Sequence, residues 1–487
     1  MSMATRLSDS SGKGCAMDKL EAERLYDSGK EPTVGKLLEL DQESKTLKAK
    51  IAALSTDSTN SSKPPSSDGP QVIRPKKKKS SRSPGGQKGH KGHKRELLPA
   101  DKMDNIVDYY PCACANCAAP VDPESCEETS DPTRRQTFEL PNKIKPVMTE
   151  HRCHELECKS CGHKTRADLP AEVAQTQFGP RVHGAVAYLT SVHKIGRRGI
   201  VEIMNTLFGL NLCLGSVCNC IDRVSPELEP VAEQARQSLP QSGNLNIDET
   251  GWKCKGDRRY LWVFVSHLVV YFTIAASRGA NVLRSVLGET FKGVITSDDH
   301  SAYSSYHKKG LRQLCWAHLI RKFKGLKETR GSPDAYVFAK YMLKEMGHIL
   351  SCWHAFREGC ITRRQLMDAT ALPRARMKRY CLKYKSSPDR EVSARAERML
   401  HNWPHLFTFV HHEGVEPTNN VSEQALRSAV QWRKLCFGNQ SENGERFTER
   451  ILTVTRTCQL HGKNSFHFLS DLMEAAFKGM PRPSLLY

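Results

Sequence analysis

The sequence lacks any long apolar segment. No stretch of about 18 apolar residues occurs, and this excludes a membrane-spanning helix of ordinary length. The first residues, Met1 to Arg6, lead into a polar stretch without the apolar centre of a secretory signal peptide. We therefore expect a cytoplasmic protein with no membrane partner.

Acidic residues are in deficit. The chain has 73 Lys and Arg against 53 Asp and Glu, a formal net charge of +20. Half of this surplus lies in residues 71–95, which hold ten Lys or Arg and no acid. Such clustering predicts attraction to a polyanion, most often nucleic acid, and in bacteria a place at the nucleoid. The alternative is a basic surface without a partner.

Cysteine is frequent but scattered, with 18 along the chain. A cytosolic protein of this size does not use such cysteines as a disulfide framework, so most are expected to be buried as small apolar side chains. The exceptions are two C-x-x-C pairs, whose spacing lets two thiolates reach one tetrahedral zinc ion. The predicted ligands of one structural Zn²⁺ are Cys114, Cys117, Cys158 and Cys161.

Three features leave that zinc assignment open. The loop between the pairs has 40 residues, longer than the 15–20 that is typical of a four-cysteine site. Nearby side chains compete as ligands, namely Cys112, His151, Cys153 and His154. A redox-active C-x-x-C is the alternative, although one such motif would suffice for that chemistry.

The N-terminal quarter has two distinct compositions. Residues 1–30 are expected to be poorly ordered, and a helix from Pro32 places Leu37, Leu40, Leu47, Ile51 and Leu54 at heptad spacing, as in a short dimerising helix or a lone amphipathic helix. A Ser/Pro-rich linker and a basic Gly/His/Lys segment follow. Its lysines, predicted to neutralise DNA phosphates, are Lys76, Lys77, Lys78, Lys79, Lys88 and Lys91. A solvated tether is the alternative.

Residues 180–239 have a helical pattern. One helix begins near Pro180, a second spans Gly199 to Gly209, and a third is expected to be capped by Ser216 and to run to Val224. Two short helices joined by a Gly-containing turn resemble a helix-turn-helix, with Arg197, Arg198 and Arg223 available to DNA. Plain helix packing is the alternative.

The next segment alternates strands and helices. Predicted strands are Leu245–Asp248, Tyr260–Ser266, Val269–Ala275, Gly293–Ser297 and Arg312–Trp316, with helices at Ala280–Leu287 and near Tyr303. The order β-β-β-α-β-α-β is that of a ribonuclease-H-like fold. In that fold the first and fourth strands are neighbours, so that Asp248 and Asp298 at their ends would meet at one metal site.

A third acid is needed, and Glu423 is the candidate. Pro417 and the pair Asn419–Asn420 mark a turn and a helix start, which puts Glu423 near the beginning of a helix and Arg427 one turn later on the same face. Three carboxylates suit two Mg²⁺ ions about 3.5–4 Å apart, one activating the attacking hydroxyl and the other stabilising the leaving oxygen of a phosphodiester.

Two neighbouring acids complicate this reading. Glu249 follows Asp248 directly and should point to the opposite face of the strand, so we exclude it from the site. Asp299 follows Asp298 directly and is a rival ligand.

Motifs along nearly the whole chain resemble the DDE transposases of the bacterial insertion sequence 66 family. They are Asn60 to Asp68; Gly85 to His93; the two C-x-x-C pairs; Asp248-Glu249-Thr250; Ser297-Asp298 with Ala302-Tyr303; Cys315 to Leu319 with Arg321; Asn419-Asn420 with Glu423 and Arg427; and Arg433-Lys434, Phe437-Gly438-Asn439 and Gly444. One departure is Asp299-His300, where the family more often has Gly-Tyr.

The resemblance implies roles for particular residues. Asp248, Asp298 and Glu423 would be the catalytic triad that binds Mg²⁺ or Mn²⁺, two ions per site. Residues 325–410 would be a helical insertion. The contacts to phosphate or to the scissile strand would be His318, Arg321, Arg427 and Lys434.

The expected organisation has five parts: an N-terminal amphipathic or coiled-coil helix at 1–56, a Ser/Pro and basic linker at 57–100, a zinc-finger (zinc-ribbon-like) domain at 101–172, a helical, helix-turn-helix-like DNA-binding domain at 173–240, and an α/β ribonuclease-H-like catalytic domain at 241–478. A transposase of this kind would bind the terminal inverted repeats of its element, cut them and join them to target DNA, as a homo-oligomer on double-stranded DNA and with companion proteins of the element. The alternatives are a nuclease or resolvase without strand transfer, and a non-catalytic DNA-binding regulator.

Overall fold

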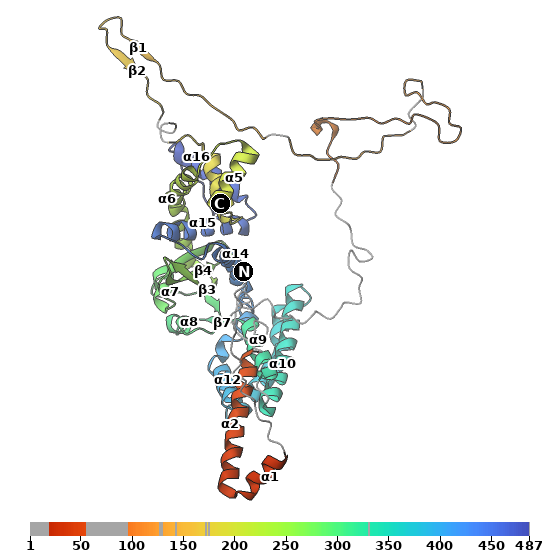
Figure 1. The fold of residues 1–487 in the computed structure, drawn as a ribbon, viewed down its shortest axis with the longest axis vertical. Coiled ribbons are helices and arrows are strands. Elements are labelled where there is room, and N and C mark those ends of the chain that lie inside the picture. Colours follow the sequence, from red (N-terminus) through yellow and green to blue (C-terminus); the bar gives the residue numbers. More distant parts are fainter. Residues whose placement is uncertain are drawn as a thin grey trace, which may run out of the picture. The chain divides into compact units, whose positions relative to one another are not determined.

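A computed structural model describes residues 19–54, 96–125, 130–141, 144–170, 173, 176–329 and 332–486. The chain divides into two compact units (Figure 1). The first, unit one, comprises residues 1–72, 168–200 and 215–487, and the second, unit two, comprises residues 73–167 and 201–214. The lysines predicted between Lys76 and Lys91 lie outside the described residues.

Two helices form the described N-terminal segment, α1 (Lys19–Asp27) and α2 (Lys30–Leu54). The expectation that residues 1–30 lack order is wrong for α1. Gly29, with φ of 111°, separates the two helices in a conformation that side chains other than glycine rarely adopt. The heptad residues Leu37, Leu40 and Leu47 of α2 are all exposed.

Unit two has little regular structure. Besides residues 201–208 of the helix α5 (Arg197–Phe208), it contains a short 3₁₀ turn, η2 (Ala100–Lys102), and an antiparallel hairpin of β1 (Glu155–Glu157) and β2 (Lys164–Arg166). Most of its side chains are exposed. A segment with so few buried apolar groups has little to stabilise it besides backbone hydrogen bonds and any bound metal.

Three helices precede the large sheet: α4 (Pro180–Ser191), α5 (Arg197–Phe208) and α6 (Leu214–Ser238). The predicted third helix is longer than expected, because α6 continues 14 residues past Val224 through Pro226 and Pro230. A continuous buried stripe from Val217 to Ala235 favours the helix over the breaks that proline usually causes. Since α6 begins at Leu214, Ser216 lies within its first turn and is not its N-cap.

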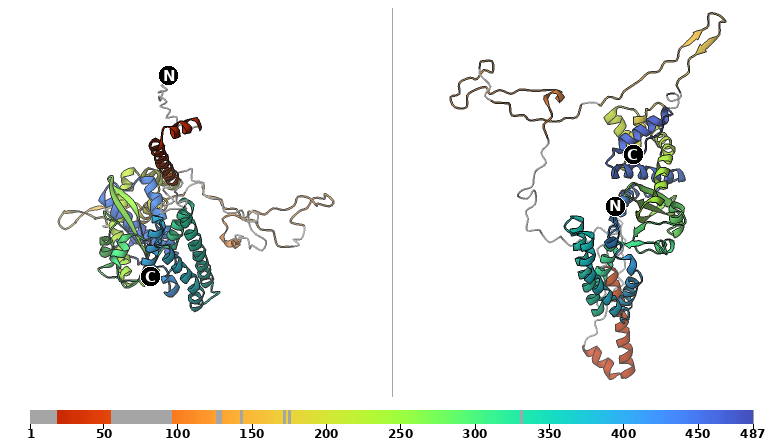
Figure 2. Two further views of the ribbon diagram at one scale, coloured as in Figure 1. Left: turned by 90° about the horizontal axis from the view of Figure 1, so that it is seen from below. Right: turned by 180° about the vertical axis from the view of Figure 1, so that it is seen from behind.

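A five-stranded sheet lies at the centre of unit one (Figures 1 and 2). Its strands in spatial order are β5 (Val270–Ala275), β4 (Asp257–Val265), β3 (Asn244–Cys254), β6 (Val294–Ser297) and β7 (Arg312–Leu314). The first three pair antiparallel, and β6 and β7 are parallel to β3. The five predicted strands are therefore confirmed, and the first and fourth lie side by side as expected. The predicted end of the first strand at Asp248 is wrong, because β3 continues to Cys254 through its pairing with β4.

Each face of the sheet carries its own apolar layer. On one face, Leu245 and Ile247 pack with α7 (Ala280–Leu287) and α8 (Ser301–Tyr306). On the other face, Trp252 packs with α14 (Asn420–Cys436) and α15 (Glu442–Leu460). Alternation along β3 thus directs odd-numbered side chains toward α7 and α8 and even-numbered ones, including Asp248, toward α14.

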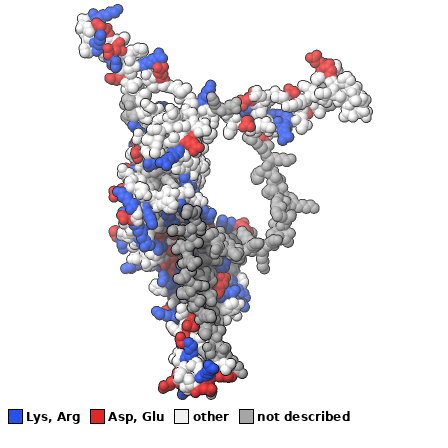
Figure 3. Space-filling model, viewed as in Figure 1, with Lys and Arg blue, Asp and Glu red and all other residues white. Residues whose placement is uncertain are grey.

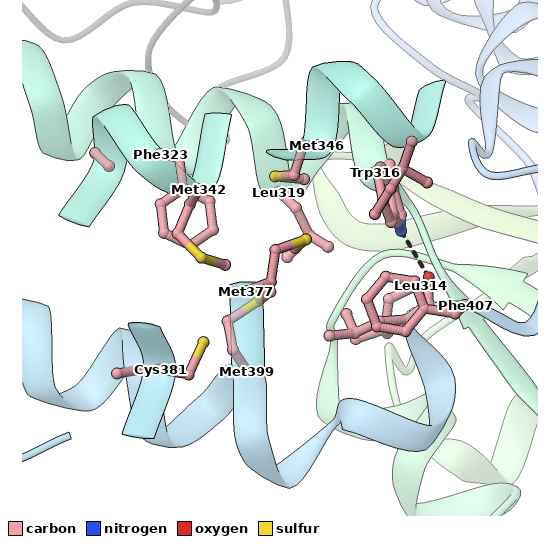
Figure 4. Packing of buried hydrophobic residues seen from close by; sticks show 14 of the residues in the cluster. Leu314, Trp316, Leu319, Phe323, Met342, Met346, Met377, Cys381, Met399 and Phe407 are labelled. Atoms are coloured by element: carbon pink, nitrogen blue, oxygen red, sulfur yellow. Dashed lines mark hydrogen bonds between the residues drawn. The ribbon is translucent and has the colours of Figure 1, made fainter. Parts of the chain in front are cut away.

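A helical body follows the last strand. It contains α9 (Trp316–Thr329), α10 (Pro333–Arg357), α11 (Arg363–Tyr384), α12 (Arg390–His401) and α13 (Thr408–His411). Its core is rich in methionine and aromatic side chains, and the indole of Trp316 donates to the carbonyl of Leu406 at 2.7 Å (Figure 4). The prediction that residues 325–410 are helical is confirmed. The chain ends in α16 (Ser465–Phe477), which packs on α4.

The segment after α14 returns to the sheet. Phe437 ends α14 in the left-handed conformation, with φ of 60°. Asn439 then pairs with the end of β3: its N–H donates to the Lys253 carbonyl at 2.9 Å, and its side chain accepts from the Trp252 indole at 2.6 Å. Gly438 fits there because a β-carbon would collide with the Lys253 carbonyl. These bonds fix the C-terminal end of α14 against the end of β3.

Within the described part of the chain, no helix is both long enough and apolar enough to cross a membrane.

Candidate active site

Two aspartates come together where β3 and β6 lie side by side. The parallel pairing places Asn246 opposite Thr296. Asp248 stands two residues further along β3, and Asp298 directly follows Ser297, the last residue of β6. Asp248 accepts the backbone N–H of Glu249 at 2.9 Å, and Asp298 accepts that of His300 at 3.0 Å. Among the described residues, neither carboxylate has an ion pair with Lys, Arg or His.

Glu423 approaches from α14, and Asn419 places that helix. The amide of the buried Asn419 donates to the Ile247 carbonyl at 2.8 Å and accepts from the Asn246 amide at 3.0 Å. Its carbonyl accepts the N–H of Glu423 at 3.2 Å, the first helical bond of α14. The start of α14 is therefore tied directly to the strand that carries Asp248.

The three acids share one electrostatic environment. Burial raises the pKa of Asp248 well above its ordinary range, and the negative charges of Glu249, Asp298 and Glu423 raise it further, while the bond from the Glu249 N–H lowers it. A carboxylate disfavoured in this way gains most from a nearby cation. The donor set therefore fits a divalent metal ion with oxygen ligands.

The triad does not converge on a single point. Ligand atoms of Cys315, His318 and Glu423 all lie within 4.8 Å of one another, and they form the one such metal-compatible group among the described residues. Oxygens of Asp248, Asp298 and Glu423 do not meet that criterion as a set. The structure thus brings the three acids into one neighbourhood without placing them around one ion.

His318 and Arg321 lie against Glu423. Both project from α9 on the side away from its apolar stripe, with their side chains 19% and 17% exposed. The Glu423 carboxylate is 3.4 Å from the Arg321 guanidinium and 3.7 Å from His318 Nδ1. Burial, and then the charge of Arg321, lower the pKa of His318 to about 4, so the imidazole is neutral at pH 7. Its buried Nδ1 has no hydrogen-bond partner among the residues that the structure describes.

Asp299, the rival ligand, faces the helical body. Its carboxylate pairs with Arg398 and accepts from the Asn402 amide at 3.4 Å, both at the end of α12. Arg398 also donates to the Asp299 carbonyl at 3.0 Å. These bonds tie the Asp299 side chain to the C-terminal end of α12.

Glu249 is on the opposite face of β3 from Asp248, as expected. Its carboxylate accepts from the Tyr303 hydroxyl and pairs with Arg278 at 2.7 Å. Burial, followed by the charge of Asp298, raises its pKa, and the bonds from Tyr303 and Arg278 lower it. Tyr303 and Asn419 are residues whose roles the sequence did not reveal, although both stand in motifs that it singled out.

The two C-x-x-C pairs have the same local structure. In each, the N–H of the first cysteine donates to the carbonyl five residues later, at 2.8 Å for Cys114 and 2.9 Å for Cys158, and its carbonyl accepts the N–H four residues later. That fourth residue has positive φ in both turns, 55° at Ala118 and 71° at Gly162. Backbone N–H groups, those of Cys117 and Asn116 in the first turn and of Ser160 and Cys161 in the second, lower the pKa of the leading thiol.

Paired N–H donors around a thiolate suit metal binding by each turn. The structure does not, however, gather three or more of these cysteines within ligand distance of one another among the described residues. The four-cysteine site therefore stays a prediction.

The remaining predicted DNA contacts are exposed. Arg427 and Lys434 lie on α14, about one and about three turns beyond Glu423. On the face shown in Figure 3, Lys and Arg side chains occur in small groups with acidic side chains among them.

Comparison with known proteins identifies the family. The profile described as "Transposase IS66 family" matches residues 175–446, more than half of the chain. The chain belongs to the IS66 family of transposases. The matched region of this IS66-family chain contains β3, β6 and α14, and with them Asp248, Asp298 and Glu423. Residues 20–96 match a separate family of unknown function, DUF6444.

Two curated relatives of this IS66-family chain come from Sinorhizobium fredii. The uncharacterized protein y4qI is 23% identical over 283 residues, which cover 52% of each chain. The uncharacterized protein y4hP is 20% identical over 429 residues, covering 78% of this chain and 73% of the relative. The chain thus spans about half the length of the first relative that it matches.

Proposed function

We propose that this chain cuts the terminal inverted repeats of its own insertion sequence and joins the freed 3′ ends to target DNA. The observation that carries the proposal is the meeting of Asp248, Asp298 and Glu423 around neighbouring strands and the start of α14, within the region that matches the family. Membership of the family supports transposition in general, and the acids supply a chemistry for it.

The metal would be Mg²⁺ or Mn²⁺ held by Asp248, Asp298 and Glu423. Two such ions, about 3.5–4 Å apart, would activate an attacking hydroxyl and stabilise the leaving oxygen. Two ions suit this geometry, because each ion needs only some of the three carboxylates as ligands and the three need not surround a single ion. The chain itself holds Glu423 through Arg321 and His318, and holds the helix of Glu423 through Asn419.

The strand order supports a ribonuclease-H-like catalytic domain. Three antiparallel strands followed by two parallel ones is the arrangement expected for it, with Asp248 within β3 and Asp298 directly after β6. The helical body between β7 and α14 is then the insertion within that domain.

DNA recognition would fall to the earlier parts of the chain. The basic linker, the two cysteine turns holding one Zn²⁺, and the helices from α4 to α6 are the proposed DNA-binding elements, with Arg427 and Lys434 near the cut strand. We propose that the chain acts as a homo-oligomer on DNA, with companion proteins of the same element.

The test uses labelled duplexes that carry the inverted repeats flanking the gene. With Mg²⁺, the wild type should nick the repeat end and join it to a second duplex, and Asp248→Asn should lose both reactions while binding the repeat normally. Asp257→Asn, an exposed acid of the same hairpin, is the matched control. Cleavage by Asp248→Asn at the wild-type rate would overturn the triad.

The same assay separates the two alternatives. A nuclease or resolvase would cleave without any joined product. A regulator would bind the repeat and produce neither product in Mg²⁺ or Mn²⁺.

A further inference from the structure

A polar cavity of about 330 Å³ lies in unit one, between the end of α4 and the helices α14 and α15. Three cations line it, namely Lys194, Arg427 and Arg456, together with the neutral side chains of Gln424, Ser428 and Gln431. No Asp or Glu is among the residues that line it. Three separate segments of the chain thus bring positive charge to one hollow.

Neutral groups hold two of these cations in place. The Lys194 ammonium donates to the Val192 carbonyl at 2.7 Å, and Lys194 itself has a φ of 57°. Arg456 donates to the Gln459 side chain at 2.6 Å and to the Gln424 carbonyl at 3.1 Å. None of the three cations has an ion pair with an acid among the residues that the structure describes, so their charges are not compensated.

Burial and like charge disfavour the charged forms of these side chains. Burial lowers the pKa of Lys194, and the charge of Arg456 lowers it further. Burial also lowers the pKa of Arg456. An anion in the cavity would relieve this repulsion and accept hydrogen bonds from both groups.

The cavity starts beside the acid cluster. Gln424, Arg427, Ser428 and Gln431 form one stripe of α14, and Arg427 follows Glu423 by one helical turn, about 5.4 Å along the axis. The volume is at the low end of small-ligand sites, which span about 300–1,000 Å³, and no aromatic side chain lines it for a base to stack on. A phosphate group fits these properties better than a whole nucleotide.

We propose that this cavity binds a backbone phosphate of the DNA strand whose neighbouring phosphate lies at Asp248, Asp298 and Glu423. The assignment rests on the proposed function for its choice of DNA as the source of the phosphate. Lys194 and Arg456 would hold the phosphate oxygens from opposite walls, and Arg427 would reach it from α14. The bound phosphate would fix the register of the strand relative to the acids.

The first test is DNA binding without divalent metal, so that cleavage plays no part. Lys194→Gln and Arg456→Gln should each reduce the salt dependence of binding to the repeat duplex, and the double variant should reduce it by about one phosphate contact in all. Lys194→Arg and Arg456→Lys, which keep the charge, should retain most of it. Arg364→Gln, which removes an exposed cation of the helical body, is the control. Equal effects of the control and the cavity variants would overturn the proposal.

The second test locates the phosphate. A series of repeat duplexes carries one neutral methylphosphonate each, at successive positions around the cut. At one position the methylphosphonate should weaken binding by the wild type and leave binding by the Lys194→Gln/Arg456→Gln double variant unchanged. Equal sensitivity of both proteins at every position would overturn the proposal. Thermal melting of each variant checks folding.

Inorganic phosphate distinguishes the remaining sources. It should raise the melting temperature of the wild type more than that of the double variant. If inorganic phosphate stabilises the wild type but no methylphosphonate position distinguishes the two proteins, the assignment to DNA is overturned and the cavity is a site for free phosphate. If one methylphosphonate position does distinguish the two proteins but the wild type never cuts the repeat, the phosphate site is supported and the proposed function is overturned.

Discussion

At the scale of single residues, buried polar side chains connect the elements of the site. Asn419 joins β3 to α14, Glu249 joins β3 to α8 through Tyr303, and Asp299 joins the end of β6 to α12 through Arg398. Each is a group that costs free energy to bury unless its hydrogen bonds are satisfied. These side chains therefore act by holding the elements of the site in place, and variants can measure that contribution.

Asn419→Ala should leave the Ile247 carbonyl and the Asn246 amide without their partner. We expect a loss of about 1–3 kcal/mol in the free energy of unfolding. As a positioning residue, Asn419 should also affect the metal site, so the Mg²⁺ concentration for half-maximal cleavage should rise about tenfold or more. Urea denaturation and a metal titration measure the two effects, with the exposed Asn420→Ala as control. An unchanged metal requirement would limit Asn419 to a structural role.

Asp298→Asn and Asp299→Asn should behave differently although the residues are neighbours. Because Asp299 is bound to Arg398 and Asn402, its variant should keep the metal requirement of the wild type. Asp298→Asn should lose metal-dependent cleavage. The measurement is the rate of repeat-end cleavage against Mg²⁺ concentration. The opposite result would make Asp299 the ligand.

At the scale of elements, α15 supports the sheet through a buried acid. Glu449 accepts from the N–H of Ile274 and from the Thr273 hydroxyl at 3.1 Å, and pairs with Arg446 at 2.8 Å. Burial raises its pKa from 4.5 to about 7, and Glu445 also raises it, whereas Arg446 lowers it. The free energy of packing α15 on β5 is thus coupled to the protonation of this carboxyl group, alongside the bonds that Thr453 and Thr457 make to β5.

The sign of this pH dependence follows from linkage. Between pH 4.5 and about 7 the folded state binds the proton of Glu449 more tightly than the unfolded state does, so stability falls as the pH rises through this window. The shift corresponds to about 3 kcal/mol. Glu449→Gln should flatten the decline, which denaturation midpoints at pH 5 and pH 8 measure. Equal slopes for both proteins would show that Glu449 titrates normally.

At the scale of the whole molecule, few apolar side chains are buried in the described part of unit two, while large apolar clusters fill unit one. A bound metal would therefore contribute more to the order of unit two than to that of unit one. Its two cysteine turns share one hydrogen-bond pattern, and this makes them equivalent halves of a single zinc site in our proposal.

The full-length protein should contain one zinc per chain. Cys114→Ser/Cys117→Ser and Cys158→Ser/Cys161→Ser should each reduce the content to near zero, because either pair alone offers only two ligands. Cys360→Ser, an exposed lone cysteine of unit one, should retain it. Metal analysis of purified protein measures this. Half of the zinc remaining in each double variant would contradict a shared site, and no zinc in the wild type would favour the redox interpretation.

Local sequence determined the strands and their acids. The alternation of β3, the apolar runs of β4 to β6, and the helix start at Asn419–Asn420 are all set by neighbours in sequence, so the pattern predicted the strand positions and the opposite orientations of Asp248 and Glu249. The positive net charge and the positions of the two C-x-x-C turns also follow from the sequence alone. The extent of α6 was not, because the burial of its stripe outweighs the local effect of two prolines.

Only the tertiary structure decided which groups meet across long separations. It placed Asn419 on Ile247, turned Asp299 toward α12, set His318 and Arg321 against Glu423, and gathered Lys194, Arg427 and Arg456 around one cavity. The reason is physical: residue type and spacing fix which face of an element a side chain occupies, but the partner on that face depends on how separate elements pack.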